Sequence, residues 1–368
     1  MIVIVTYEAM PNNSPGAIRC NSLAQAYIRL GYDVYVLHKG IYSSATNPFA
    51  ISCHNDNRFK RYFGFSKTVI SHLDELKRNS KIDAVITYGF FKSIYCWCAK
   101  YNIKCVVDVV EWYSKEQFKY WYFAIPYLKK ECDIRNITKY KVNVIAISSY
   151  LEQYFRKYGC KAVRIPIITD GPVEYKRIGI PTDRVRIIYA GSHILMDNVL
   201  LIIKTISELA ADTKKRILFS IYGLSREKIL QYISESEFAK VEDSVRIHGR
   251  RPNNEIIEAY KKSHFSIVIR DPSLRVNKAG FPSKVIESMK MGVPVICNYS
   301  SDLDLYLKDN VNCIVANDIT QKSLTNAILK ALTINTSEYS QISLNAQKTV
   351  EKEFNISTYS KEFEEIIK

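Results

Sequence analysis

The chain has 368 residues, of which 47% are hydrophobic and 24% are charged, and its formal net charge is +15. This length and balance fit two globular domains, each with its own core, and exclude a largely disordered chain. Nine cysteines without paired spacing argue against a disulfide framework and a zinc site.

Short apolar runs alternate with helical patterns through the first half of the chain. The runs are rich in β-branched residues, as buried parallel strands are, so this half predicts a Rossmann-like, doubly wound sheet over residues 1–170. The predicted strands cover residues 2–6, 33–37, 83–87, 104–110, 142–147 and 162–166, and the predicted helices include residues 16–30, 69–79 and 91–101.

The loop after the first predicted strand contains Gly16 and Arg19. Glycine lets a ligand approach the backbone closely, and the start of the next helix favours an anion. A strand-to-helix turn can also need a glycine for conformational reasons alone, so both interpretations stay open.

Two carboxylates, Asp108 and Glu111, stand at the end of the fourth predicted strand. A carboxylate at such an edge can bind an acceptor hydroxyl and accept its proton, or it can cap a helix.

No run of about eighteen apolar residues occurs, and the sequence starts without the features of a signal peptide, so we expect a cytoplasmic protein.

The positive charge is concentrated in the first half. Residues 1–180 hold 26 Lys and Arg against 14 Asp and Glu, whereas the remainder holds 26 against 23. Within that half, residues 58–67 and 118–130 interleave cations with aromatic side chains, which suits an anionic membrane surface. A nucleic-acid surface would share these groups, and single aromatics can belong to the core. No nucleic-acid-binding module accompanies them, so we expect a peripheral protein of the inner membrane face and no nucleic-acid partner.

A linker rich in glycine and proline over residues 171–183 precedes a second alternating pattern over residues 184–350. The first strand of this half ends at Gly191, followed by Ser192 and His193. The predicted strands cover residues 186–190, 216–222, 245–248, 265–269, 293–297 and 312–315. The tail over residues 351–368 predicts a helix that returns to the N-terminal domain.

Residues 280–298 form the most informative segment. Pro282 suits the first turn of a helix and Gly292 suits its left-handed end, so a helix is predicted over about residues 282–291. Lys284 and Glu287 lie on one face of this helix, opposite an apolar face. The backbone N–H groups of its first turn, with Ser283 and the Lys284 ammonium, suit a diphosphate, and Glu287 can accept hydrogen bonds from ribose hydroxyls. On spacing alone, Lys284 and Glu287 also fit a solvated surface pair.

This segment resembles the donor-binding motif of family 4 retaining glycosyltransferases, group 1, which have the two-domain GT-B fold. Glu287, Met289, Gly292 and residues 294–295 match the family pattern, but its first Glu falls on Ala279. The five residues before Val285 resemble a variant of the motif in which these positions bind the donor; they are Gly280, Phe281, Pro282, Ser283 and Lys284.

The resemblance implies further roles. Gly16 and Arg19 match the position of a donor-contacting loop, and Glu111 that of a residue on the acceptor side. The family usually has an Arg soon after the glycine at position 191 and a Lys further on. This chain has Ser192, His193 and Asp197 there, which leaves Lys284 and Arg270 to supply the positive charge.

We therefore expect an α/β protein of GT-B fold, with two Rossmann-like domains facing a central cleft. The resemblance implies a metal-independent transferase without a cofactor that moves a sugar, with retention, from a nucleotide-diphosphate donor, expected to be a UDP-sugar. The predicted acceptor is a glycan or lipid-linked hydroxyl in surface polysaccharide or glycolipid assembly. Lys284 and Glu111 are the candidate catalytic residues. The alternatives are a nucleotide-sugar epimerase of GT-B fold and a non-enzymatic basic protein that binds nucleic acid or a membrane.

Overall fold

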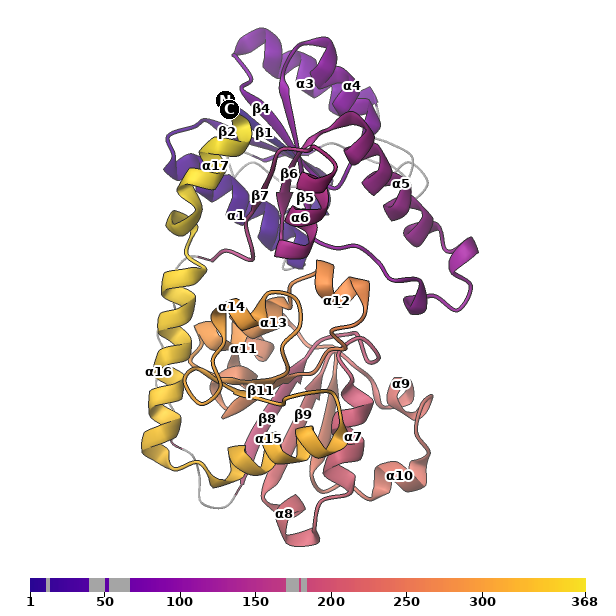
Figure 1. The fold of residues 1–368 in the computed structure, drawn as a ribbon, viewed down its shortest axis with the longest axis vertical. Helices are drawn as coiled ribbons and strands as arrows, with labels where there is room; N and C mark the ends of the chain where they lie inside the picture. The colour runs from indigo at the N-terminus through magenta and orange to yellow at the C-terminus, as the bar shows by residue number, and fades with distance from the viewer. Residues whose placement is uncertain (11–13, 40–49, 53–66, 170–178, 180–183) are drawn as a thin grey trace. The chain divides into compact units, whose positions relative to one another are not determined.

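The computed structural model describes residues 1–10, 14–39, 50–52, 67–169, 179 and 184–368. It divides into two compact units, each built around its own parallel sheet (Figure 1). Unit 1 comprises Met1–Thr169, Ala279–Phe281 and Asn355–Lys368, and unit 2 comprises Asp170–Lys278 and Pro282–Phe354. The predicted linker, residues 171–183, lies outside the described residues apart from Gly179.

Unit 1 contains a seven-stranded sheet with the strand order β3-β2-β1-β4-β5-β6-β7, in which all neighbouring strands are parallel. The order reverses direction between β1 and β4, as in a Rossmann fold. The strands are β1 (Ile2–Ala9), β2 (Val34–Lys39), β3 (Ala50–Ser52), β4 (Ala84–Tyr88), β5 (Lys104–Val109), β6 (Asn143–Ala146) and β7 (Ala162–Arg164).

Helices cover both faces of this sheet because its buried side chains alternate along each strand. In β1, Ile2 and Ile4 pack in one core with α1 and α17, whereas Val3 and Val5 pack in another with α3 and α4. The helices of unit 1 are α1 (Pro15–Arg29), α3 (Lys67–Asn79), α4 (Lys92–Lys100), η1 (Lys115–Gln117), η2 (Trp121–Phe123), α5 (Ile125–Tyr140), α6 (Ser149–Lys157), η3 (Ile356–Tyr359) and α17 (Ser360–Ile367).

Unit 2 repeats the arrangement with six parallel strands in the order β10-β9-β8-β11-β12-β13. The order reverses direction between β8 and β11. The strands are β8 (Val185–Ala190), β9 (Ile217–Tyr222), β10 (Val245–Gly249), β11 (Phe265–Val268), β12 (Val295–Cys297) and β13 (Cys313–Val315). The helices are α7 (Val199–Ser207), α8 (Ala211–Lys215), α9 (Arg226–Leu230), α10 (Glu235–Ala239), α11 (Asn253–Lys261), α12 (Arg275–Ala279), α13 (Ser283–Lys290), α14 (Leu303–Tyr306), α15 (Gln321–Thr333) and α16 (Thr336–Glu353).

The C-terminal segment belongs to unit 1 although it follows α16 of unit 2. Phe363 of α17 is fully buried against Tyr27 of α1, with the two ring centroids 5.2 Å apart, and the Tyr27 hydroxyl donates to the Phe363 carbonyl at 3.2 Å. Asn143 Nδ2 donates to the Ile366 carbonyl at 2.9 Å. The last helix therefore completes the core of unit 1.

The predicted alternation of strands and helices is present in both units, with shifts of a few residues at the element ends. The prediction did not include β3 or α5. Strand β3 is only three residues long, and α5 begins inside the segment that the sequence marked as basic and aromatic. Pro126 was an available signal for α5, since the helix starts at Ile125 and proline is common in the first turn of a helix.

Candidate active site

The carboxyl ends of three neighbouring strands of unit 2 turn at glycines. Gly191 follows β8, Gly223 follows β9, and Gly249 ends β10. The Gly191 N–H donates to the Tyr222 carbonyl at 2.9 Å, and the Gly223 N–H donates to the Gly249 carbonyl at 2.7 Å. The β8 end also borders the point where the strand order reverses, and open α/β sheets bind their ligands there.

Helix α13 presents two different faces at the same edge. Val285, Ile286 and Met289 are buried, as the sequence predicted, and Gly292 has the left-handed φ of 71° expected after the helix. The helix begins at Ser283, with Pro282 as its N-cap rather than its first helical residue. Glu287 is exposed, so it is available to a ligand.

Lys284 is much less accessible than a surface pair would be. Its side chain is only 12% exposed and its ammonium forms an ion pair with Asp197, a residue of the loop that joins β8 to α7. The Lys284 Nζ also lies 4.5 Å from the centroid of the Tyr189 ring. The alternative of a solvated Lys284–Glu287 pair therefore does not describe this lysine.

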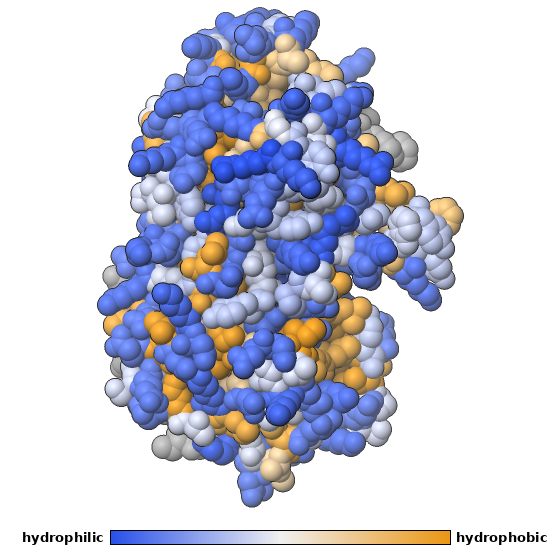
Figure 2. All heavy atoms as spheres, viewed as in Figure 1, coloured by the Kyte–Doolittle hydropathy of each residue, from blue (hydrophilic) through white to orange (hydrophobic). Residues whose placement is uncertain are grey.

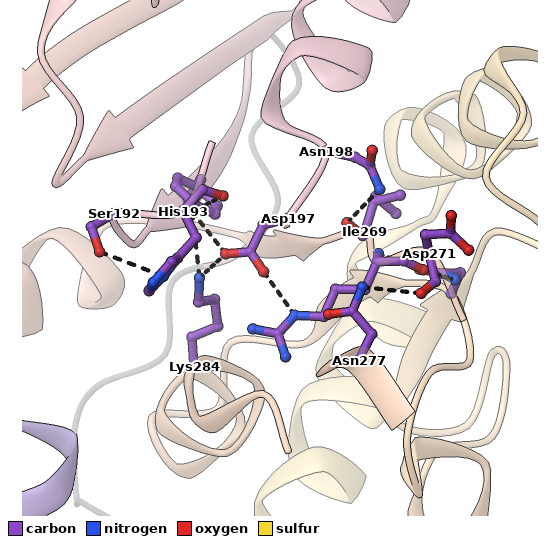
Figure 3. A network of polar contacts seen from close by, with 11 residues as sticks. Ser192, His193, Asp197, Asn198, Ile269, Asp271, Asn277 and Lys284 are labelled. Atoms are coloured by element: carbon purple, nitrogen blue, oxygen red, sulfur yellow. Dashed lines mark hydrogen bonds and ion pairs between the residues drawn. The ribbon is translucent and has the colours of Figure 1, made fainter. Parts of the chain in front are cut away.

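Asp197 holds the second predicted cation as well. Its Oδ1 accepts from Arg270 Nε at 2.7 Å, and its Oδ2 accepts from the Tyr189 hydroxyl at 2.8 Å (Figure 3). The Arg270 backbone is fixed in turn by Asn298, whose side chain accepts from the Arg270 N–H at 2.8 Å and donates to its carbonyl at 2.7 Å. Two cations and one carboxylate thus form a buried cluster with a formal charge of +1.

The pKa directions follow from this arrangement. Burial opposes ionisation of Asp197, but the positive charges of Arg270 and Lys284 outweigh it and hold the carboxyl pKa well below its usual range. Burial lowers the pKa of Lys284, and Asp197 partly restores it. Desolvation by the surrounding protein atoms raises the pKa of Glu287, which Ser283 and Lys284 oppose.

The absence of a side chain at Gly191 leaves room for the Lys284 ammonium. A Cβ at position 191 would overlap Lys284 Nζ and would come within 2.7 Å of the Tyr189 hydroxyl oxygen. The glycine therefore lets the ammonium lie directly against the backbone at the end of β8. Such a site combines a charged donor with exposed backbone and suits an anionic group.

Ser192 and His193 are exposed beside this cluster. The His193 backbone carbonyl accepts from the Asp197 N–H at 3.1 Å, and Lys228 donates to the Ser192 carbonyl at 3.1 Å. Partial desolvation lowers the pKa of His193, and Lys284 and Arg270 lower it further against the opposing effect of Asp197. His193 is therefore a neutral imidazole at neutral pH, able to donate or accept one hydrogen bond.

Comparison with known proteins gives this site its context. Residues 172–349, which contain all the residues of the cluster, match the model of the family described as glycosyl transferases group 1. This part of the chain is a group 1 glycosyl transferase domain. No curated protein sequence matches the chain.

Solved glycosyltransferase structures share the fold of the whole chain. Sucrose-phosphate synthase from Thermosynechococcus elongatus is 15% identical, with a TM-score of 0.71, and the match covers 99% of this chain and 97% of that one. HepE from Anabaena, in complex with UDP and glucose, is 13% identical, with a TM-score of 0.69 and coverage of 99% and 98%. WaaG, a glycosyltransferase involved in lipopolysaccharide biosynthesis, is 14% identical, with a TM-score of 0.68 and coverage of 100% and 99%. The predicted GT-B fold is confirmed.

Of the remaining donor-site predictions in the transferase domain, Ser283 is the first residue of α13 and Pro282 is buried just before it. Gly280 and Phe281 precede them and are grouped with unit 1. Ala279, at the position of the missing family carboxylate, is fully buried.

Arg19 requires a correction. Its guanidinium is buried and donates to both carboxylate oxygens of Asp108, at 3.1 and 3.0 Å, and to the carbonyls of Ile165 and Pro166. Every guanidinium nitrogen is therefore engaged inside unit 1, and we remove Arg19 from the donor-binding set. Asp108, in the same way, is a structural partner.

The other two predicted residues of unit 1 lie at its sheet edge. Gly16 stands near the start of α1 against Glu8, whose side chain a Cβ at position 16 would meet at 2.8 Å. Glu111, at the end of β5, is half-exposed and lies 3.5 Å from Lys130 Nζ. Gly16 is buried, so of these two residues only Glu111 is an accessible position for an acceptor group.

Sequence reasoning missed the roles of Asp197 and Tyr189. It treated Asp197 only as a departure from the family pattern, where a cation is usual. The available signal was the presence of Arg270 and Lys284 without an assigned counter-ion in the same domain.

Within the described residues, no helix is both long enough and apolar enough to span a membrane, and no three His, Cys, Asp or Glu side chains lie close enough together to hold a metal ion.

Proposed function

We propose that the chain transfers a sugar from a UDP-sugar to the hydroxyl of a lipid-linked or glycan acceptor, with retention at the anomeric carbon and without a metal ion. The observation that carries the proposal is the cluster of Lys284 and Arg270 at the carboxyl edge of a group 1 glycosyl transferase domain. A buried cationic site at such an edge matches the chemistry of a donor diphosphate.

In the proposed reaction, a bond forms between the acceptor oxygen and the anomeric carbon, and the bond from that carbon to the diphosphate oxygen breaks. The leaving diphosphate gains negative charge, which Lys284 and Arg270 stabilise because they are held in place before the reaction. Glu287 accepts hydrogen bonds from the ribose hydroxyls. Glu111 is the candidate acceptor of the hydroxyl proton in unit 1.

The membrane part of the proposal is supported by an aromatic projection, which we define as residues 118–128. Figure 1 shows this segment extending from unit 1 at the start of α5, and Figure 2 shows pale and orange residues at its tip. Its large side chains are exposed, including Phe123 at 78% and Trp121 at 42%. Lys119 is exposed beside them, 5.6 Å from the centroid of the Tyr120 ring. The second predicted basic segment, residues 58–67, lies outside the described residues apart from Lys67.

The test is to incubate the purified chain with a panel of nucleotide sugars and free nucleoside diphosphates while following thermal unfolding. We expect stabilisation by UDP and one UDP-sugar, because a ligand that binds only the folded state raises its stability. Lys284→Ala and Glu287→Ala should weaken this binding at least about tenfold, the loss expected when a hydrogen bond to a charged group is removed. Lys322→Ala, on the exposed side of α15, is the matched control and should bind like the unaltered chain.

Three outcomes would oppose the proposal. Conversion of the donor to its epimer without an acceptor would identify an epimerase. Salt-sensitive binding to RNA or DNA without a response to any donor would identify a non-enzymatic basic protein. Unchanged donor binding in both variants would show that the diphosphate site lies elsewhere.

A further inference from the structure

The transferase domain contains a buried carboxylate between the two cations of its site. The Asp197 side chain is 0% exposed and accepts from three side chains: Tyr189, Arg270 and Lys284. Because it is enclosed by these partners, Asp197 does not present an oxygen to a ligand. Its effect on a bound molecule must pass through the groups that it holds.

Those groups depend on Asp197 for both position and charge. Lys284 has a long, flexible side chain with a single charged head, and Asp197 fixes that head against Gly191. Without the carboxylate, the buried ammonium would keep Arg270 as a like-charged neighbour, and its remaining partners would include the Tyr189 ring, the Tyr189 hydroxyl at 3.5 Å and the charge of Glu287.

We infer that Asp197 is a positioning residue of the donor site, which keeps the Lys284 ammonium charged and directed along the Gly191 backbone, where a diphosphate oxygen binds. This inference rests on the proposed function. It assigns a role to the residue that stands where the resemblance leads one to expect a cation, and it explains why the cluster contains a negative charge at all.

The charged surroundings of Lys284 determine its titration. Asp197 faces it from the loop before α7 and Arg270 from the end of β11, while Glu287 lies on its own helix and His193 on the β8 loop. Burial lowers the pKa of Lys284, Asp197 raises it, Arg270 lowers it, and Glu287 raises it. Replacing Asp197 with a neutral residue removes the larger of the two raising effects, so Lys284 should lose its proton at a lower pH.

The direction in which UDP affinity changes on replacing Asp197 distinguishes a positioning role from a purely electrostatic one. The change Asp197→Asn raises the formal charge of the cluster from +1 to +2, and charge alone would then strengthen the binding of a diphosphate. A positioning role gives the opposite result, since a displaced or neutral Lys284 no longer donates to the phosphate.

The experiment measures the dissociation constant of UDP from pH 6 to pH 10 by titration calorimetry. For Asp197→Asn we expect at least about tenfold weaker binding at pH 8.5, with the alkaline loss of affinity starting at least about one pH unit lower than in the unaltered chain. Binding as tight as, or tighter than, that of the unaltered chain across this range would overturn the inference.

A rescue variant tests the charge of Lys284 directly. An arginine stays protonated at every pH of the experiment, so Asp197→Asn combined with Lys284→Arg should lose the alkaline shift that Asp197→Asn alone shows. Lys284→Arg alone is the control for the altered shape. Persistence of the shift in the double variant would place the titrating group elsewhere and contradict the inference.

If Asp197→Asn does not fold, Asp197→Glu provides the test, because it keeps the charge and moves the carboxylate by one methylene. We expect at least about fivefold weaker UDP binding with an unchanged alkaline midpoint, whereas a lower unfolding temperature with unchanged affinity would show a purely structural role.

If the unaltered chain binds no nucleoside diphosphate, the proposed function fails and this inference with it. If the unaltered chain binds UDP and the variants match it, only this inference fails.

Discussion

Arg19 and Lys284 show that a cation predicted to bind the donor can serve either structure or ligand binding. Arg19 lies in α1, three residues after Gly16, and Lys284 lies in α13 and meets Gly191 in space. Arg19, however, faces Asp108 and two carbonyls inside unit 1, whereas Lys284 lies against the Gly191 backbone at a sheet edge. The number of partners already engaged, and not the charge, decides which of the two remains available to a diphosphate.

Arg19→Met should therefore reduce stability without affecting the donor. The substitution leaves Asp108 buried and unpaired, and breaking such a pair costs about 3–5 kcal/mol. We expect a loss of that size in urea unfolding, with UDP affinity unchanged in the folded protein. Arg78→Met, at the exposed end of α3, should leave both quantities unchanged. A tenfold loss of UDP affinity in Arg19→Met would restore Arg19 to the donor site.

Glu287 should make the affinity for UDP fall at acid pH. Desolvation raises the pKa of this carboxyl group, so its ionised form is favoured less in the folded chain than in the unfolded one. The resulting contribution to stability is present below the unfolded pKa and is lost as the pH rises through the folded pKa. The effect on binding has the opposite direction, since the ribose requires the ionised form, and affinity should fall as the pH drops through the raised pKa.

The measurement for Glu287 is UDP affinity between pH 4.5 and pH 7 in the unaltered chain and in Glu287→Gln. The glutamine of the variant cannot titrate. The phosphates of UDP titrate in both experiments, so their effect cancels in the ratio of the two affinities. We expect the ratio of the two affinities to approach one towards pH 4.5. A constant ratio over the whole range would exclude Glu287 as the titrating group.

At the scale of the element, helix α13 was predictable because Pro282 and Gly292 mark its ends and its apolar residues have helical spacing. Its burial pattern follows from the same spacing. The ion pairs of Lys284 were not predictable, because Asp197 is 87 positions away in the chain and meets it only when β8 and α13 come together at one sheet edge. Local sequence determines the helix, whereas the charge of the site depends on contacts across the domain.

The glycine turns at the ends of β9 and β10 provide a test at the same scale. Gly223 has a φ of 92°, and a Cβ there would meet the Gly191 backbone carbonyl at 2.5 Å. Gly249 also has a positive φ, 68°, but a Cβ there has no neighbour within 4 Å. An alanine would have a strained backbone at either position, but its Cβ would collide with a neighbouring atom only at position 223.

Gly249→Ala should thus cost about 1 kcal/mol, the typical cost of a left-handed residue, and Gly223→Ala at least about 2 kcal/mol, since the backbone at Gly191 must also move. Chemical unfolding of both variants measures these costs. Because the displaced strand end contains the Lys284 site, UDP affinity should fall in Gly223→Ala and stay unchanged in Gly249→Ala. Equal losses of stability in the two variants would show that the loops absorb the collision.

At the scale of the whole molecule, the basic excess and the aromatic projection belong to the same half of the chain. Residues 1–180 carry a net charge of +12 and the remainder +3. The exposed side chains of the projection occur next to one another, at Tyr120, Trp121, Tyr122 and Phe123, whereas Tyr232 in unit 2 is exposed alone. A cluster of aromatics on a cationic unit is suited to the interface of an anionic membrane, and single exposed aromatics need no such explanation.

The double variant Trp121→Ser and Phe123→Ser should therefore lose membrane binding while keeping donor binding. Each aromatic that leaves the interface removes on the order of 1 kcal/mol of apolar burial, and two together lower the affinity about tenfold or more. Sedimentation with phosphatidylglycerol vesicles measures this loss, and Tyr232→Ser is the matched control with unchanged binding. Binding to neutral phosphatidylcholine vesicles should be weaker than to anionic ones and should respond little to salt, because the basic unit contributes its attraction only to charged lipid. Equal binding of the double variant and the control to anionic vesicles would show that the projection does not contact the membrane.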